Sequence, residues 1–157
     1  MLEKLKEDKK FLELNRLLNE LQSKYALSIS ELIAVASDIK IPISIFSTDL
    51  GPLEVIVKFL HDNKGLSFVS IARLVGRTKQ GIFQAYKSSK NKSQGTLPVT
   101  RSKFDIPVSI LANRYSVLEC IVKHLRDNFR LKFSQIGRLI SRDPRTVWVV
   151  YNRTKKK

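Results

Sequence analysis

Cysteine is almost absent from this sequence, and other residues that mark special chemistry are also few. The 157 residues include one cysteine, one tryptophan, two histidines, six glycines and five prolines. A single cysteine, Cys120, excludes a disulfide within the chain, and with opening residues that alternate acid and base it predicts a cytoplasmic protein without a signal peptide. No apolar run approaches the roughly 18–20 residues that cross a membrane, so no membrane association is expected.

The residue groupings that support catalysis are missing as well. The sequence holds no glycine-rich phosphate loop, no cysteine–histidine cluster with metal spacing and no serine–histidine–aspartate arrangement. The histidines His61 and His124 stand far apart, and Cys120 falls at a helical position. We therefore predict a protein that is not an enzyme and that has no catalytic residues, no metal site and no cofactor.

Acidic residues are scarce in one part of the chain only. The sequence has 29 Lys+Arg against 14 Asp+Glu, a formal net charge of +15. Residues 1–40 hold seven of each sign, whereas residues 41–157 hold 22 basic and seven acidic residues and carry the whole excess. Such segregation is typical of a surface that binds nucleic acid, because each neutralised phosphate releases counterions. A general solubility charge would mix the two signs.

The basic part contains the same module twice. A shift of 65 positions places residues 41–90 (the first copy) on residues 106–155 (the second copy) without a gap, and 20 of the 50 positions are identical. The predicted domains are an N-terminal helical segment at 1–40, a first module at 41–88, a basic linker at 89–104 and a second module with a basic tail at 105–157. We expect a flexible linker that lets the modules sit about one turn of B-DNA apart, roughly 34 Å.

Each copy is predicted to form three helices. Apolar residues spaced i, i+3, i+4, i+7 predict first helices over about 52–62 and 117–127. A short second helix follows, and the third begins after only three residues, with Thr78 and Asp143 as its N-caps. The predicted fold class is all-α, with two tandem three-helix modules after an N-terminal helical hairpin.

Two smaller features are repeated with the helices. The segments IPISIF and IPVSIL, which open the copies, alternate in a way that predicts short extended arms able to pair, although their proline is equally consistent with a helix start. Within the first helices, Glu54 is expected to pair with Lys58, and Glu119 with Lys123, four residues on.

The residues around the last two helices point to a known family. They are Ile71-Ala72, Val75-Gly76 and Ile82 in the first copy, and Ile136-Gly137, Ile140-Ser141 and Val147 in the second. A small residue at the helix crossing and a glycine in the turn resemble a helix-turn-helix of the sigma-factor region-4-like and homeodomain-like transposase type. In the second copy, Ser141 stands where the motif has glycine. The resemblance covers both copies and implies binding to double-stranded DNA.

The resemblance also implies that the third helix of each copy enters the major groove. Carried over by position, the residues expected at base edges are Thr78, Lys79, Gln80, Gln84, Lys87, Arg145, Thr146, Trp148, Asn152 and Arg153. Those expected at phosphates are Arg73, Arg77, Arg138, Arg142, Lys155, Lys156 and Lys157. For the arginines, the alternative is a solvated face or a structural ion pair. For Phe83 and Trp148, it is packing against the first helix.

The neutral N-terminal segment carries a separate pattern. Apolar residues step by three and four as in a coiled-coil seam, at Phe11, Leu14, Leu18, Leu21 and Tyr25. Ser28 and Glu31 form a capping box that starts a second short helix. The seam predicts a homodimer through residues 1–40. The alternative is that this hairpin covers the apolar face of the first module.

Together these patterns predict sequence-specific binding of double-stranded DNA by a prokaryotic transcriptional regulator that is associated with the nucleoid. Two alternatives stay open. One is a DNA-targeting accessory module of a recombination, partition or phage machine. The other is an RNA-binding protein, although structured RNA hides its major groove from an inserted helix.

Overall fold

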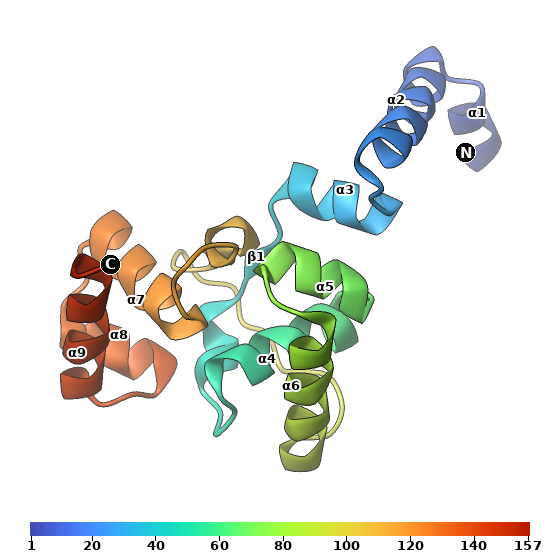
Figure 1. Cartoon of the computed structure of the whole chain (residues 1–157). Helices are drawn as coiled ribbons and strands as arrows, with labels where there is room; N and C mark the ends of the chain where they lie inside the picture. The colour runs from blue at the N-terminus through green and yellow to red at the C-terminus, as the bar shows by residue number, and fades with distance from the viewer. The chain divides into compact units, whose positions relative to one another are not determined.

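The computed structural model describes residues 1–157, apart from the side chain of Ala34, and is all-α except for one small sheet (Figure 1). The all-α class predicted from the sequence is therefore confirmed. The chain divides into two compact units, Met1–Asp38 (the N-terminal unit) and Ile39–Lys157 (the repeat unit). Among the described residues, no helix combines the length and the apolar character needed to cross a membrane.

The N-terminal unit is built from short, locally capped helices. They are α1 (Leu2–Lys6), α2 (Lys9–Tyr25) and α3 (Ile29–Ser37). The Asp8 carboxylate caps α2 by accepting a hydrogen bond from the N–H of Lys10 at 2.8 Å. At the start of α3, the N–H of Glu31 donates to Ser28 Oγ at 3.1 Å and the N–H of Ser28 donates to the Glu31 carboxylate at 2.6 Å. The predicted capping box is confirmed.

Each copy in the repeat unit contains three helices. The first copy has α4 (Pro52–Lys58), continued by a π-helical segment (Phe59–Asn63), then α5 (Phe68–Val75) and α6 (Lys79–Lys92). The second copy has α7 (Val117–Phe129), α8 (Phe133–Ile140) and α9 (Pro144–Lys155). Both predicted N-caps are confirmed: Thr78 Oγ1 accepts from the N–H of Gly81 at 3.1 Å, and Asp143 Oδ1 accepts from the N–H of Arg145 at 2.8 Å.

A small residue lies where the turn after the second helix folds back in each copy, Ala72 in the first and Gly137 in the second. The backbone N–H of Arg77 donates to the carbonyl oxygen of Ala72, and that of Arg142 donates to the carbonyl oxygen of Gly137, both at 2.9 Å. A Cβ atom at Gly137 would lie 2.5 Å from the carbonyl oxygen of Arg142. Only glycine fits the second copy as it stands, whereas alanine fits the first.

The two copies share one apolar core because the repeat preserves its apolar positions. Ile56, Ile71 and Ile82 are fully buried in the first copy, and their counterparts Ile121, Ile136 and Val147 are buried in the second. All six belong to a single hydrophobic cluster. Burial of this apolar surface is the main force that holds the repeat unit together.

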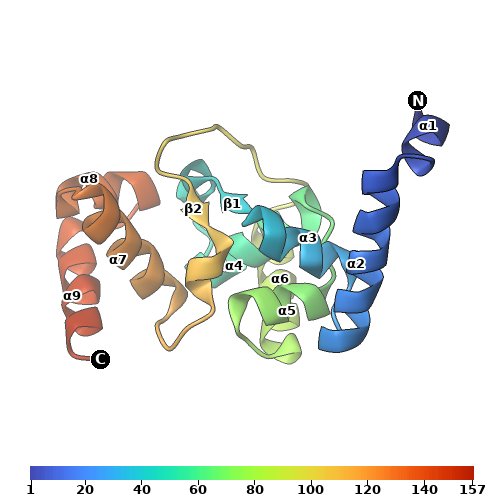
Figure 2. The same cartoon turned by 90° about the horizontal axis from the view of Figure 1, so that it is seen from above.

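The arms that open the copies pair with each other (Figure 2). Strands β1 (Lys40–Ile41) and β2 (Ile106–Pro107) are antiparallel, and Ile41 lies opposite Ile106. After the proline each arm turns into a 3-10 helix, Ile43–Phe46 or Val108–Leu111. Both alternatives predicted from the sequence are therefore present: each arm begins as a paired strand and continues, after its proline, as a short helix.

Each arm then packs on the opposite copy. The 3-10 helix Ile43–Phe46 contacts α8, Val108–Leu111 contacts α5, and α4 contacts α7. The turn before α6 also meets the second copy, because Arg77 Nη2 donates to the carbonyl oxygen of Tyr115 at 2.9 Å. At Gly76 the backbone φ is +66°, and an added Cβ would lie 3.3 Å from Ala112 Cα. The copies are interlocked parts of one unit.

The connection between the copies is anchored, which corrects the expectation of a flexible linker. Helix α6 extends to Lys92, into the segment predicted to be linker. Beyond it, Leu97 is buried, and it exchanges two hydrogen bonds with the side chain of Asn63, at 2.9 and 3.1 Å. Further on, the N–H of Thr100 donates to Ser44 Oγ at 3.0 Å. The relative position of the two copies is therefore set by packing and not by the length of a flexible linker.

Candidate nucleic-acid interface

Helices α6 and α9 each bury one side and expose the other. Ile82 in α6 and Val147 and Val150 in α9 face the core. The residues predicted at base edges are exposed around α6 at Thr78, Lys79, Gln80, Gln84 and Lys87, and on α9 at Arg145, Thr146, Trp148 and Arg153. Asn152 is half-buried. The structure therefore gathers these residues onto two equivalent helix faces, one in each copy.

A repeated hydrogen bond fixes the third helix of each copy on the first. Tyr86 OH donates to Asp62 Oδ1 at 2.8 Å, and Tyr151 OH donates to Asp127 Oδ1 at 2.8 Å. The tyrosines lie on α6 and α9, and the aspartates lie at the ends of the first helices. Together with buried Ile82 and Val147, these contacts hold each helix with one side inward and the predicted residues outward.

The same carboxylates hold the lysines of the first helices. Lys58 Nζ lies 2.7 Å from Asp62 Oδ2, and Lys123 Nζ lies 2.6 Å from Asp127 Oδ2. The ion pairs expected between these lysines and the glutamates four residues before them are wrong. On a helix, an acid four residues before a lysine and an acid four residues after it are both within reach. The aspartates are favoured here because the tyrosine hydroxyls orient their carboxylates.

The glutamates instead hold the far ends of the third helices. Glu54 accepts hydrogen bonds from Ser88 Oγ at 2.7 Å and from Lys92 Nζ at 2.9 Å, and Glu119 accepts from Lys157 Nζ at 2.7 Å. Lys157, predicted at a phosphate, is therefore committed to a carboxylate whose side chain is only 6% exposed. Its neighbours Lys155 and Lys156 are exposed.

These contacts lower the pKa values of four carboxyl groups. Burial acts to raise the pKa of Glu54, Asp62, Glu119 and Asp127, but hydrogen bonds and nearby cations outweigh it in each case. For Asp62, the stabilising partners of the charged form are Lys58 and Tyr86. The folded state therefore binds protons at these groups less readily than the unfolded chain does.

We expect the repeat unit to lose stability as the pH falls below about 4, since the ordinary carboxyl pKa values are about 3.9 for Asp and 4.3 for Glu. A lowered folded-state pKa contributes stability that is fully present above these values and is lost as the pH falls through the folded-state pKa. Urea unfolding at pH 7 and pH 3 measures the change. An unfolding free energy that is the same at both pH values would contradict the lowered pKa values of these four carboxyl groups.

Acidic groups in residues 41–157 are largely taken up inside the fold. Four of the seven belong to the contacts above, Asp143 caps α9, and Asp105 Oδ1 accepts from the N–H of Ile43 at 3.3 Å. The predicted base-edge residues on and beside α6 and α9 are all cationic, amide, hydroxyl or aromatic. The two faces therefore favour an anionic partner.

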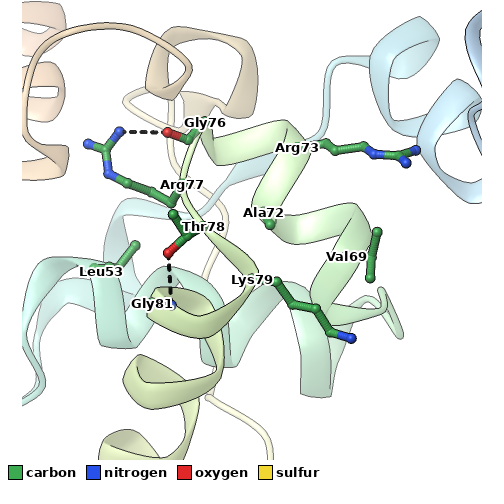
Figure 3. Close-up of a pocket in the computed structure, with 9 residues that line it drawn as sticks. All are labelled: Leu53, Val69, Ala72, Arg73, Gly76, Arg77, Thr78, Lys79 and Gly81. Carbon is green, nitrogen blue, oxygen red and sulfur yellow. Dashed lines mark hydrogen bonds between the residues drawn. The ribbon is translucent and has the colours of Figure 1, made fainter.

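The arginines predicted at phosphates differ in their surroundings. Arg73 and Arg138 are exposed, whereas Arg77 and Arg142 are half-buried. Arg77 is engaged at the contact between the copies, and Arg142 Nη1 donates to the carbonyl oxygen of Ser141 at 3.1 Å. Figure 3 shows Arg73 and Arg77 extending to opposite sides of the turn between α5 and α6. The two side chains therefore do not form one cluster.

The turn between α5 and α6 also borders a shallow, mainly apolar hollow of about 550 Å³ (Figure 3). Its lining is formed by Leu53, Val69, Ala72, Arg73, Gly76, Arg77, Thr78, Lys79 and Gly81. Val69 was not among the predicted site residues. Val69 precedes the buried Ile71 by two residues, which places it on the outer side of α5. An apolar residue on that side is not explained by the core.

Phe83 and Trp148 occupy equivalent positions and are 47% and 54% exposed. Phe83 meets Phe68 of α5 edge to face, with 5.7 Å between the ring centroids. Trp148 lines two hollows, of about 500 and 490 Å³. Neither aromatic side chain is taken up by packing against the first helix, so both present a ring on the outer face.

Asn152 lines the hollow between Trp148 and the basic end of α9. Among the described residues, its Nδ2 is a buried side-chain nitrogen without a hydrogen-bond partner. A buried donor left unpaired costs about 1–3 kcal/mol. An acceptor on a bound ligand in this hollow would remove that cost.

Other reactive side chains lie in packed surroundings. His61 stacks on Phe68 with 4.5 Å between the ring centroids, and its Nδ1 lies 2.8 Å from the carbonyl oxygen of Leu66. Cys120 is buried, and burial raises the pKa of its thiol. Within the described part of the chain, no group of three or more histidine, cysteine, aspartate or glutamate side chains could hold a metal ion.

No protein-family model matches the chain, and no match is found among the curated proteins or the solved structures. The candidate interface therefore rests on the residues and contacts described above.

Proposed function

We propose that the protein binds double-stranded DNA through the exposed faces of α6 and α9, as a sequence-specific regulator of transcription. The proposal rests on one observation: both copies repeat the same arrangement of the third helix. In both copies a capped helix follows a three-residue turn, buries its inner side and exposes cations, hydrogen-bonding groups and an aromatic ring. A helix presented in this way is the element that fits the major groove.

The chemistry of the outer faces suits base recognition. Gln80 and Gln84 on α6 carry the amide groups that pair with adenine, and Arg145 on α9 carries the guanidinium that pairs with guanine. Lys79 and Lys87 add cations beside the glutamines. Because the internal acids are neutralised by internal partners, these cations remain available to phosphates and bases.

A selection from randomised duplexes tests the proposal. We expect an enriched motif, bound at moderate salt, with log K falling linearly as log salt rises. Duplex RNA and single-stranded DNA of the same sequence serve as competitors. Failure to enrich any motif would overturn the regulatory function, and preference for the RNA would favour an RNA-binding protein instead.

We also propose that a second copy of the chain covers the seam on α2. Leu14, Leu21 and Tyr25 of this seam are 49%, 39% and 57% exposed, an apolar stripe at heptad spacing. A dimer would carry four reading helices and bind with greater avidity.

Sedimentation of the full chain tests the dimer. We expect Leu14→Asp with Leu21→Asp to convert the dimer to a monomer, since each buried charge would stand unpaired in the seam. Asn15→Asp with Asn19→Asp adds the same charge at exposed positions off the seam and serves as the control. A wild-type chain that sediments as a monomer at micromolar concentration would contradict the proposal.

A further inference from the structure

The two copies are related by a local two-fold axis. Ile41 and Ile106 occupy the same position in the repeat, 65 residues apart, and they face each other in an antiparallel pair. Antiparallel pairing of equivalent residues means that a half turn about an axis between them carries one strand onto the other. Helices α4 and α7, which are also equivalent, contact each other.

The contacts of the arms are reciprocal in the same way. The 3-10 helix of the first copy lies on α8, and that of the second copy lies on α5, the counterpart of α8. Contacts in which i meets j and j meets i define a two-fold interface of the kind found in symmetric dimers. Here both halves belong to one chain, and α6 and α9 are the corresponding third helices.

This relation is held rigidly. The arms Ile43–Phe46 and Val108–Leu111 insert buried apolar residues into the shared core, and Arg77 bonds the second copy. Leu97 and Thr100 anchor the connection on the first copy. The two third helices therefore keep one spacing and one orientation.

The outer faces, in contrast, are not symmetric. Gln80 in the first copy corresponds to Arg145 in the second, and Lys87 corresponds to Asn152. Glutamine and arginine favour different bases. If both helices enter one duplex, a half turn between them places their half-sites in opposite orientations, and their unlike residues make the half-sites unlike in sequence.

Resting on the DNA-binding function proposed above, we propose that one chain binds one bipartite duplex site whose two half-sites are inverted, unlike in sequence and fixed in spacing. The two half-sites then run in opposite directions along the duplex, and the chain binds the whole site in one orientation only. A flexible tether between the copies would instead accept direct or inverted half-sites and several spacings.

Variants of the enriched duplex test this inference with the full wild-type chain. One variant reverses a single half-site, which turns an inverted pair into a direct pair. Two others insert 5 or 10 base pairs between the half-sites, a half turn and a full turn of B-DNA. Because linking two binding modules raises overall affinity by about 10²–10⁴-fold, we expect each variant to lose about a hundredfold in affinity.

The outcomes separate this inference from the function on which it rests. Loss of affinity in all three variants supports a fixed two-fold arrangement. Retained affinity with the 10-base-pair insertion, or with the reversed half-site, overturns the fixed arrangement and leaves DNA binding intact. Failure of the chain to bind any duplex overturns both.

Discussion

Replacing Lys79, Gln80 and Arg145 together by alanine is expected to lower affinity for the enriched duplex by about a hundredfold, since each good base contact contributes about 1–3 kcal/mol of discrimination. All three side chains are exposed, so the fold should be unaffected. Fluorescence anisotropy on the enriched duplex and on a scrambled duplex gives the ratio of the two affinities. That ratio should fall towards one.

A matched control removes the same amount of charge elsewhere. Lys64 and Lys103 are exposed in the repeat unit and lie outside the proposed surface. Their replacement by alanine should weaken binding to both duplexes slightly and leave the ratio unchanged. An unchanged ratio in the first variant would mean that α6 and α9 do not read the sequence.

Asp62→Ala is expected to destabilise the protein far more than Asp127→Ala, although the two aspartates make the same contacts. The Lys58 side chain is 1% exposed, whereas that of Lys123 is 42% exposed. Removing one partner of a buried ion pair costs about 3–5 kcal/mol, because the other charge stays buried. An exposed pair contributes about 0–1 kcal/mol.

Urea unfolding of both variants measures the difference. Each variant also loses one tyrosine hydrogen bond of the same length, so that loss largely cancels in the comparison. We expect Asp62→Ala to lose about 2–5 kcal/mol more than its counterpart, from the difference between buried and exposed pairs. Equal losses would show that Lys58 finds another partner or reaches water when Asp62 is absent.

The helices and caps could be predicted from the sequence because their causes are local. Thr78, Asp143 and the Ser28–Glu31 pair act on backbone groups two or three residues away, so a short window contains the whole interaction. The apolar positions of the core were predicted for a related reason. Helical spacing alone places them on one face.

The ion pairs and the linker could not be predicted in this way because tertiary contacts decide them. Lys58 has an acid four residues before it and another four residues after it, and the Tyr86 hydroxyl favours the second. The linker has the composition of a loop, and only the single apolar residue Leu97 indicates that it is anchored. The identity of Asp62 and Tyr86 with their counterparts was an available signal for the repeated hydrogen bond.

The sequence predicts that the two arms can pair, but it does not show on which copy each arm packs. IPISIF and IPVSIL would show the same alternation if each folded back on its own copy. Pairing between Ile41 and Ile106 depends on the closure of a loop of 65 residues and on the fit of each arm against α5 or α8. Neither condition can be read from a local pattern.

The emission of Trp148 tests the central claim most directly. It is the single tryptophan of the chain, it is 54% exposed, and it lies on the proposed interface. If α9 enters the groove, saturation with the enriched duplex should change the emission of Trp148 and shield it from acrylamide. Unchanged emission and unchanged acrylamide quenching, while anisotropy shows the labelled duplex to be bound, would contradict the claim.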